Sequence, residues 1–195
     1  MLDCFNREIS YLRVSVTDRC NLRCTYCMSA DGVPMLNHTD ILSFDEIADV
    51  VRYGAENGIK KVRITGGEPL VRKGVVQLIS LLSKIDGIEE LTMTSNGILL
   101  PAFAIDLKAA GLKRINISLD TLDPVRFSEL SRGGNLQNVL AGIDAAVEAG
   151  LTPVKLNCVI RKSPAEPDAQ MVQQFADSRG IEVRYIHLMN LNTGE

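Results

Sequence analysis

The chain has 195 residues, of which 21 are Lys or Arg, 24 are Asp or Glu and five are Cys, so its formal net charge is −3. A hydrophobic fraction of 46% and a charged fraction of 23% are ordinary for a globular protein and exclude a disordered chain. The sequence has no basic patch for nucleic acid, no apolar run near the roughly 18 residues that a membrane span needs, and no secretory signal. We therefore expect one cytoplasmic domain over residues 1–195 that binds neither nucleic acid nor membranes.

Short segments rich in Val, Ile, Leu and Thr alternate along the chain with segments of helical periodicity. The predicted strands are Leu12–Thr17, Lys61–Thr65, Glu90–Thr94, Arg114–Leu119, Pro153–Ile160 and Glu182–Leu188. The predicted helices are one that begins after a capping box at Ser43 and Glu46, and others over residues 75–85, 101–110, 136–147 and 167–178. This alternation predicts an α/β fold with parallel strands and outer helices. Six strands are too few for a closed eight-stranded barrel, so we expect an open six-unit arc or an open sheet.

One face of five predicted strands is polar. Period-two alternation places Arg13, Arg63 and Lys155 on this face, with Asp120 as its only acid, whereas the sixth strand, with Arg184, alternates less clearly. Burying three cations without partners would be costly, so the polar face predicts a chamber for an anionic ligand such as a polyphosphate. The alternative is that the three cations are salt-bridged or exposed to solvent at an open edge.

Three of the five cysteines, Cys20, Cys24 and Cys27, form a C-x3-C-x2-C run just after the first predicted strand. Thiolates at this density in a cytosolic protein bind soft metals. A structural zinc site would need a fourth ligand, which Cys4 or His38 would have to supply. Three thiolates on an iron–sulfur cluster leave one iron open to a further ligand, and we favour this interpretation.

The second predicted strand runs directly into Gly66-Gly67-Glu68-Pro69. Two glycines at a strand end allow a close backbone approach or a positive φ, and Glu68 supplies a carboxylate suited to an ammonium group. The carboxyl ends of parallel strands meet at one edge of the sheet, where ligands bind in α/β folds. We therefore expect this glycine turn to lie beside the cysteines.

The cysteine spacing and the glycine turn together resemble the radical S-adenosylmethionine (SAM) superfamily. Further segments resemble the GTP 3′,8-cyclase family, which makes the first intermediate of molybdenum cofactor biosynthesis. These segments are Leu12–Cys20, Lys61–Leu70, Asn116–Asp123, Val154–Asn157 and Ile181–Met189. The resemblance implies an open partial (βα)6 barrel of the radical SAM type and a lyase activity.

The resemblance also implies ligands and residue roles. One 4Fe–4S cluster would be held by Cys20, Cys24 and Cys27, which are also the catalytic candidates. The SAM-binding candidates are Tyr26, Gly66, Gly67, Glu68, Ser118 and Met189. The candidates for binding GTP, or another phosphorylated small molecule, are Arg13, Arg63, Thr94, Lys155 and Arg184. A reductant protein such as flavodoxin or ferredoxin would drive cleavage of SAM to a 5′-deoxyadenosyl radical, which would abstract hydrogen from C3′ of GTP.

The chain departs from the cyclase pattern after its sixth predicted strand. The family holds a second 4Fe–4S cluster on three cysteines beyond the barrel, whereas no cysteine follows Cys158 here. We therefore expect the carboxyl-terminal cluster domain to be absent. The alternatives are a short radical SAM homologue with another substrate, and a truncated or degenerate core that binds a cluster and a nucleotide without cyclase activity. A homodimer and a missing carboxyl-terminal partner segment both stay open.

Overall fold

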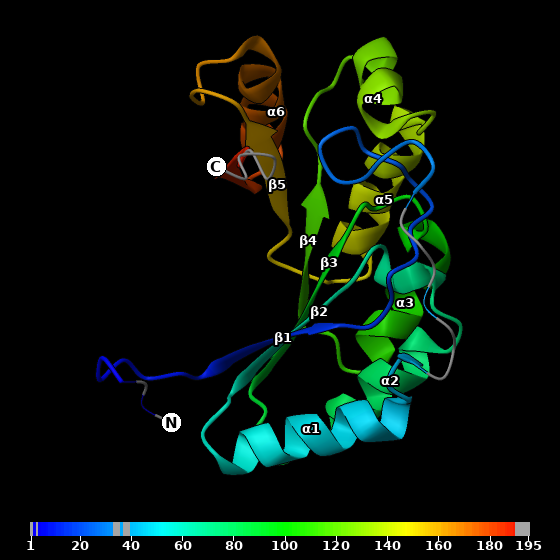
Figure 1. Cartoon of the computed structure of the whole chain (residues 1–195). Coiled ribbons are helices and arrows are strands. Elements are labelled where there is room, and N and C mark those ends of the chain that lie inside the picture. The colour runs from blue at the N-terminus through cyan, green and yellow to red at the C-terminus, as the bar shows by residue number, and fades with distance from the viewer. Residues whose placement is uncertain (1, 3, 33–35, 37–39, 190–195) are drawn as a thin grey trace.

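The computed structural model describes residues 2, 4–32, 36 and 40–189, in which six parallel strands form a curved sheet (Figure 1). The strands pair in sequence order, each with the next, from β1 to β6. Their bounds are β1 Tyr11–Ser15, β2 Lys61–Thr65, β3 Glu90–Ser95, β4 Arg114–Ser118, β5 Lys155–Ile160 and β6 Glu182–His187. Because β1 and β6 are the two ends of this order, the sheet is an open arc, and the expected partial barrel is confirmed.

Every predicted strand is present, with small differences at its ends. The fifth strand begins at Lys155 and not at Pro153, because proline has no N–H to donate to a neighbouring strand. The first strand ends at Ser15, although the backbone N–H of Val16 still donates to the Thr65 carbonyl at 2.9 Å.

The helices connect successive strands. Their bounds are α1 Phe44–Glu56, α2 Val75–Leu82, α3 Leu100–Ala109, α4 Pro124–Ser131, α5 Leu136–Glu148 and α6 Pro167–Asp177, with a short 3-10 helix at Pro69–Val71. The capping box at Ser43 is confirmed: the Glu46 N–H donates to Ser43 Oγ at 3.2 Å, and the Ser43 N–H donates to Glu46 Oε2 at 2.7 Å. None of these helices is long and apolar enough to cross a lipid bilayer, which holds for the described part of the chain.

The helix α4 was not among the predicted elements. Its start carries a clear chemical pattern, because Asp123 Oδ1 accepts from the Arg126 N–H at 2.9 Å and Pro124 occupies the first helical position. Only Phe127 and Ser131 of this helix are buried, so it shows no apolar stripe.

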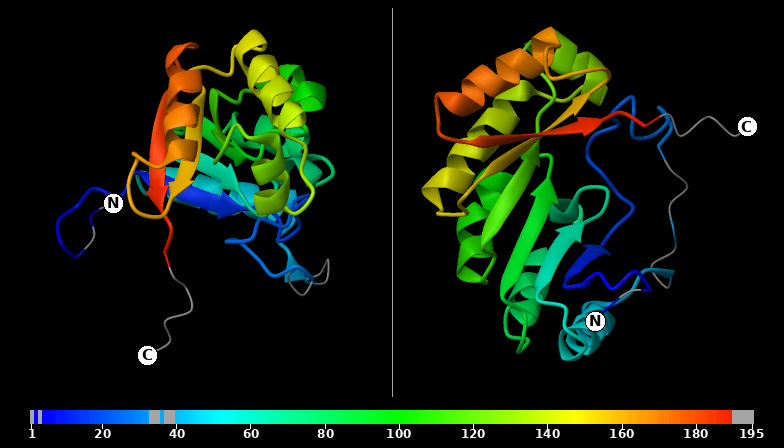
Figure 2. Two further views of the ribbon diagram at one scale, coloured as in Figure 1. Left: turned by 90° about the horizontal axis from the view of Figure 1, so that it is seen from above. Right: turned by 90° about the vertical axis from the view of Figure 1, so that its left-hand side faces the viewer.

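The apolar face of the sheet packs against the helices and forms the core. Ile64, Met93, Ile117 and Leu156 lie on four neighbouring strands and are fully buried there. The right-hand view of Figure 2 shows the opposite, concave face of the strands with most of the helices behind them. The arrangement leaves this polar face available to a ligand, as the alternation of residues predicts.

Candidate functional site

The cysteine loop, defined as residues 20–28, follows the carboxyl end of β1. Its second half is a tight turn in which the N–H groups of Cys27 and Met28 donate to the Cys24 carbonyl at 2.9 and 3.2 Å. The loop rests on the last turn of α4, where the Arg23 N–H donates to the Ser131 carbonyl at 3.2 Å. The Thr25 N–H donates to the Leu130 carbonyl at 2.8 Å. The unpredicted helix α4 therefore supports the cysteines directly.

The three thiols of the loop lie close enough to influence one another. Burial, together with the charges of Asp120, Cys27 and Cys20, raises the pKa of Cys24 to about 11. Burial is also the main cause of a raised pKa at Cys20, to which the Cys27 charge contributes. The raised pKa values of Cys20 and Cys24 favour their protonated thiols, so binding of a metal centre by these two residues would release protons.

Tyr26 connects the cysteine loop to the ends of β4 and β5. Its hydroxyl donates to Asp120 Oδ2 at 2.6 Å, and Asp120 Oδ1 accepts from the Val159 N–H at 2.8 Å. Burial raises the pKa of the Tyr26 hydroxyl well above its usual range, and the Asp120 charge adds to this shift. Burial also raises the pKa of Asp120, although the tyrosine hydrogen bond opposes that shift. This pair fixes one side of the loop against the sheet.

The glycine turn lies against the chain that enters the cysteine loop, as predicted. The Gly67 N–H donates to the Thr17 carbonyl at 2.7 Å, and the Glu68 N–H donates to the Arg19 carbonyl at 2.8 Å. A Cβ at Gly66 would lie 2.6 Å from the Thr17 oxygen, and one at Gly67 would lie 2.3 Å from the Arg19 oxygen. The two backbones can approach this closely only because both residues are glycine.

Glu68 is 1% exposed, and its carboxylate is surrounded by donors of the chain itself. Oε1 accepts from the Leu70 N–H at 3.1 Å and from Ser95 Oγ at 3.0 Å, and Oε2 accepts from the Asn96 N–H at 2.7 Å. Burial raises the pKa of Glu68, while these three hydrogen bonds lower it. Glu68 therefore joins the glycine turn to the end of β3. Its expected role toward an ammonium group stays a prediction.

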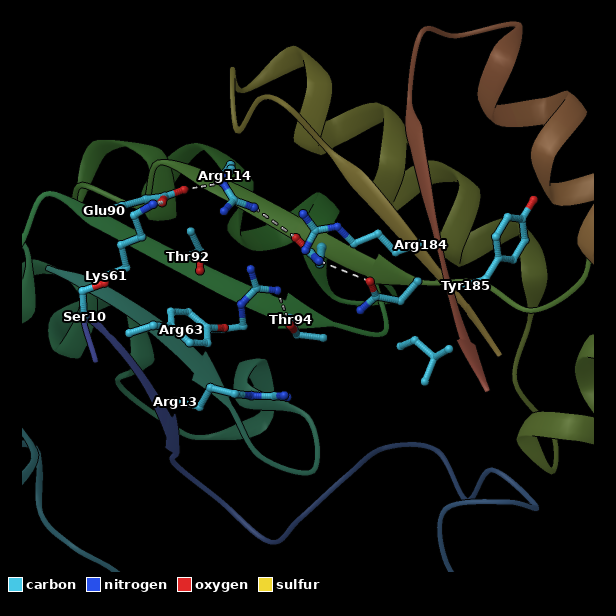
Figure 3. A pocket seen from close by; sticks show the side chains of 14 residues that line it. Ser10, Arg13, Lys61, Arg63, Glu90, Thr92, Thr94, Arg114, Arg184 and Tyr185 are labelled. Atoms are coloured by element: carbon cyan, nitrogen blue, oxygen red, sulfur yellow. Dashed lines mark hydrogen bonds and ion pairs between the residues drawn. The ribbon is translucent and has the colours of Figure 1, made fainter. Parts of the chain in front are cut away.

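The concave face of the sheet contains a cavity of about 600 Å³ (Figure 3). It is lined by Ser10, Tyr11, Arg13, Lys61, Arg63, Glu90, Thr92, Thr94, Arg114, Asn116, Asn157, Arg184, Tyr185 and Ile186. Five of these side chains are cationic and one is anionic, so the cavity, called the basic cavity below, favours an anionic ligand.

Arg63 is the most buried cation of the basic cavity, at 7% exposed. Its Nη1 donates to Thr94 Oγ1 at 3.3 Å, whereas its buried Nε has no hydrogen-bond partner among the described atoms. Its register partner on β1 is Arg13, so two cations lie side by side on adjacent strands. Burial lowers the pKa of the Arg63 guanidinium, and the neighbouring Arg114, Arg184 and Arg13 add to this effect. An anion in the cavity would offset the cost of burying the unpaired Arg63 Nε and the repulsion between the neighbouring cations.

Four of the five predicted phosphate-binding residues line the basic cavity, and Lys155 does not. Lys155 forms an ion pair with Glu182, which also accepts from Arg184 Nε at 3.1 Å. The alternative of salt-bridged cations therefore applies to Lys155. Arg13 has no ion pair among the described residues, but it is exposed on the edge strand β1, so the alternative of solvent exposure at an open edge applies to it. Neither alternative applies to Arg63, which is buried and has no ion pair among the described residues.

The polar face holds charged residues that the sequence interpretation missed. Asp120 is not its only acid: Glu90 lines the basic cavity and forms an ion pair with Arg114. Arg114 Nη1 also donates to Asn116 Oδ1 at 3.5 Å, and Asn116 Nδ2 donates to Asn157 Oδ1 at 3.2 Å. Period-two alternation would have identified Glu90 and Arg114, because they share the faces of Thr92 and Asn116.

Comparison with known proteins identifies the family. The sequence matches the radical SAM superfamily over residues 14–172. The chain belongs to the radical SAM superfamily. It is 51% identical over 194 residues to the GTP 3′,8-cyclase of Peptoclostridium acidaminophilum, covering 100% of this chain and 60% of the relative. It is also 51% identical over 193 residues to that of Moorella thermoacetica (strain ATCC 39073 / JCM 9320), covering 99% and 60%. The chain thus spans about 60% of the length of these curated relatives.

Solved structures show the same fold. SuiB from Streptococcus suis bound to S-adenosylmethionine superposes with a TM-score of 0.78 at 21% identity, covering 94% of this chain and 42% of SuiB. Methylornithine synthase superposes with a TM-score of 0.76 at 14% identity, covering 92% of this chain and 53% of the synthase. At these identities the likeness establishes the radical SAM fold alone.

Of the two predicted site residues not yet described, Ser118 lies beside the loop. Cys24, Tyr26 and Ser118 line a small cavity of about 30 Å³, together with Asp120. Met189 lies just after β6 and is 74% exposed.

The donor set of the cysteine loop is the three thiols of Cys20, Cys24 and Cys27. Within the described ranges, no three His, Cys, Asp or Glu side chains converge closely enough to hold one metal ion. A tetrahedral zinc site needs such convergence, whereas a cluster carries its thiolate ligands on separate irons. His38, weighed as a zinc ligand, lies outside the described residues. The chemistry of the three neighbouring thiols fits a soft metal centre.

Proposed function

We propose that this chain carries the radical chemistry of a GTP 3′,8-cyclase of molybdenum cofactor biosynthesis. In this proposal Cys20, Cys24 and Cys27 hold one 4Fe–4S cluster and GTP occupies the basic cavity. The observation that carries the proposal is the excess of cations in that cavity, on the concave face of the sheet that bears the cysteine loop. Identity near 50% to proteins of that name over almost the whole chain supports it.

The cluster and SAM would supply reductive cleavage of SAM and hydrogen abstraction at C3′ of GTP. The contribution of the chain is to bind and orient the reactants. The expected SAM-binding residues are Tyr26, Gly66, Gly67, Glu68, Ser118 and Met189. Tyr26 and Glu68 are hydrogen-bonded to groups at the strand ends, which fixes the loop and the glycine turn.

The cations of the basic cavity would bind the triphosphate. Arg13 and Arg63 lie on adjacent strands and present a double positive charge, which suits a polyanion better than a single carboxylate. Thr94 holds the Arg63 guanidinium in place through its hydroxyl. Lys155 would have to exchange its Glu182 partner for a phosphate oxygen, and Glu182 is exposed enough to be released into water.

The proposal is tested by anaerobic reconstitution of the full chain with iron and sulfide. We expect iron and sulfide to be bound, and we expect dithionite-driven cleavage of SAM to change when GTP is added. Purified material that carries zinc in place of iron and sulfide would overturn the cluster assignment. Cleavage that does not respond to GTP would favour the short homologue with another substrate.

SAM cleavage and the complete cyclisation are measured separately, because the chain spans about 60% of its curated relatives. Formation of the cyclised nucleotide from GTP would extend the proposal to the whole reaction. Cleavage without that product would limit it to the radical-forming step.

A further inference from the structure

The residue that ends α4 combines an unfavourable backbone conformation with contacts to the cysteine loop. Arg132 caps the helix with φ +55° and ψ +60°, in the left-handed region that residues with a Cβ rarely adopt. Helices usually place Gly or Asn at such a position. A side chain kept there at this cost indicates that the side chain has a use.

The Arg132 guanidinium forms two hydrogen bonds, both to the cysteine loop. Its Nη1 donates to the Arg23 carbonyl at 2.8 Å and to the Met28 carbonyl at 2.8 Å. Arg23 and Met28 lie immediately before Cys24 and immediately after Cys27. A single donor therefore bridges the two ends of the segment that contains two of the three thiols.

The charge of Arg132 also suits this location. The last carbonyls of α4, those of Leu130 and Ser131, face the loop and accept its N–H groups. The carboxyl end of a helix carries a partial negative charge. The guanidinium offsets this negative end beside the cysteine loop.

We propose that Arg132 is a positioning residue for the metal-binding loop. It ties together the two ends of the segment that contains Cys24 and Cys27, and its positive charge lies at the carboxyl end of α4. The identity of the metal centre as a cluster rests on the proposed function, whereas the fixing of the loop does not. Because the guanidinium is exposed, it acts on the loop more than on the stability of the fold.

The test compares Arg132→Gly and Arg132→Lys with the unaltered full chain. Glycine removes the two hydrogen bonds of the guanidinium and relieves the strain of the left-handed backbone. The melting temperature of the metal-free protein is therefore expected to stay equal or rise. In the reconstituted protein, an iron chelator is expected to remove the cluster about ten-fold faster from the glycine variant, as is typical when a group supporting metal ligands is lost. The lysine variant keeps the charge and is expected to be intermediate, and the electron paramagnetic resonance signal of the reduced cluster is expected to change with Gly.

The matched control is Asn6→Gly, which relieves a positive φ of 59° outside the cysteine loop. It is expected to leave the rate of cluster loss unchanged. Equal rates and identical spectra for Arg132→Gly and the unaltered chain would overturn the proposal. Cluster loss that only follows a fall in melting temperature would also overturn it, since that result indicates a purely structural role.

A second measurement does not depend on the cluster. Hydrogen exchange of the backbone N–H groups of residues 23–28 in the metal-free chain is expected to be about ten-fold faster in Arg132→Gly. Faster exchange without any uptake of iron and sulfide by the unaltered chain would support the positioning role and refute the proposed function. Unchanged exchange would refute the positioning role itself.

Discussion

Replacement of Gly67 by alanine gives the most direct test of how the glycine turn supports the cysteine loop. The added Cβ would lie 2.3 Å from the Arg19 oxygen, 2.6 Å from the Arg19 carbonyl carbon and 2.9 Å from the Asp18 oxygen. All three neighbours are backbone atoms, so no side-chain rotation can relieve the contact. The φ of Gly67 lies outside the left-handed region, so the whole cost is one of space.

Relief of this contact would move the glycine turn away from β1 and break two hydrogen bonds. These bonds join the Gly67 N–H to Thr17 and the Glu68 N–H to Arg19. Overpacking costs about 1–3 kcal/mol, and each lost hydrogen bond costs about 0.5–1.5 kcal/mol. We therefore expect Gly67→Ala to lower the free energy of unfolding by about 2–6 kcal/mol, a large part of the roughly 5–15 kcal/mol of a whole domain.

The assay is urea unfolding of the metal-free chain followed by far-UV circular dichroism, with Gly133→Ala as the control. Gly133 has a φ of +103° but no atom within 4 Å of an added Cβ, so its cost is one of backbone strain, about 1–2 kcal/mol. Because Arg19 precedes Cys20, we also expect reconstituted Gly67→Ala to bind less iron. If Gly67→Ala is as stable as Gly133→Ala, the glycine turn can move to accommodate the added Cβ at little cost, and the reasoning is wrong.

Three further predictions concern buried groups. Tyr26→Phe leaves Asp120 Oδ2 without a donor, so unfolding at pH 7 should cost about 1–3 kcal/mol less than in the unaltered chain. This loss of unfolding free energy should be smaller near pH 4, because burial raises the pKa of Asp120 and its protonated carboxyl group does not need the tyrosine donor. Equal losses in urea unfolding at pH 7 and pH 4 would contradict this reasoning. Burial raises the pKa of Cys158 to about 12, so this thiol should not react with iodoacetamide at pH 8. Mass spectrometry should find Cys158 unmodified and the exposed Cys4 alkylated. A modified Cys158 in the folded chain would show that β5 opens. Arg63→Met should lower GTP affinity by about ten-fold or more in calorimetry while the melting temperature holds or rises, whereas unchanged affinity would remove Arg63 from the binding site.

The sequence predicts the architecture well because strand and helix periodicity are local properties. The apolar positions of the strands, such as Ile64 and Ile117, are buried as expected, and the opposite positions line the basic cavity. The glycine turn lies against the entry to the cysteine loop because both follow the carboxyl ends of neighbouring parallel strands.

The sequence-based predictions fail where a contact depends on the register between two strands, or on a helix that the sequence pattern does not reveal. Lys155 on β5 pairs with Glu182 on β6, which lies 27 residues further along the chain, so periodicity along one strand could not reveal the partner. The helix α4 was missed because it buries few apolar residues, although Asp123 and Pro124 mark its start. With α4 missing, nothing in the sequence pointed to Arg132.

Three charged residues of the basic cavity lie at the opposite ends of the strands from the cysteines, whereas Arg13, Arg63 and Arg184 lie within their strands. Lys61, Glu90 and Arg114 are the first residues of β2, β3 and β4, whereas the cysteine loop and the glycine turn follow strand carboxyl ends. The ligand specificity of the basic cavity can thus be redesigned by exchanging side chains at the beginnings of the strands. The turns that surround the thiols need not be altered, so one scaffold can retain its cysteine loop while its selectivity is rebuilt.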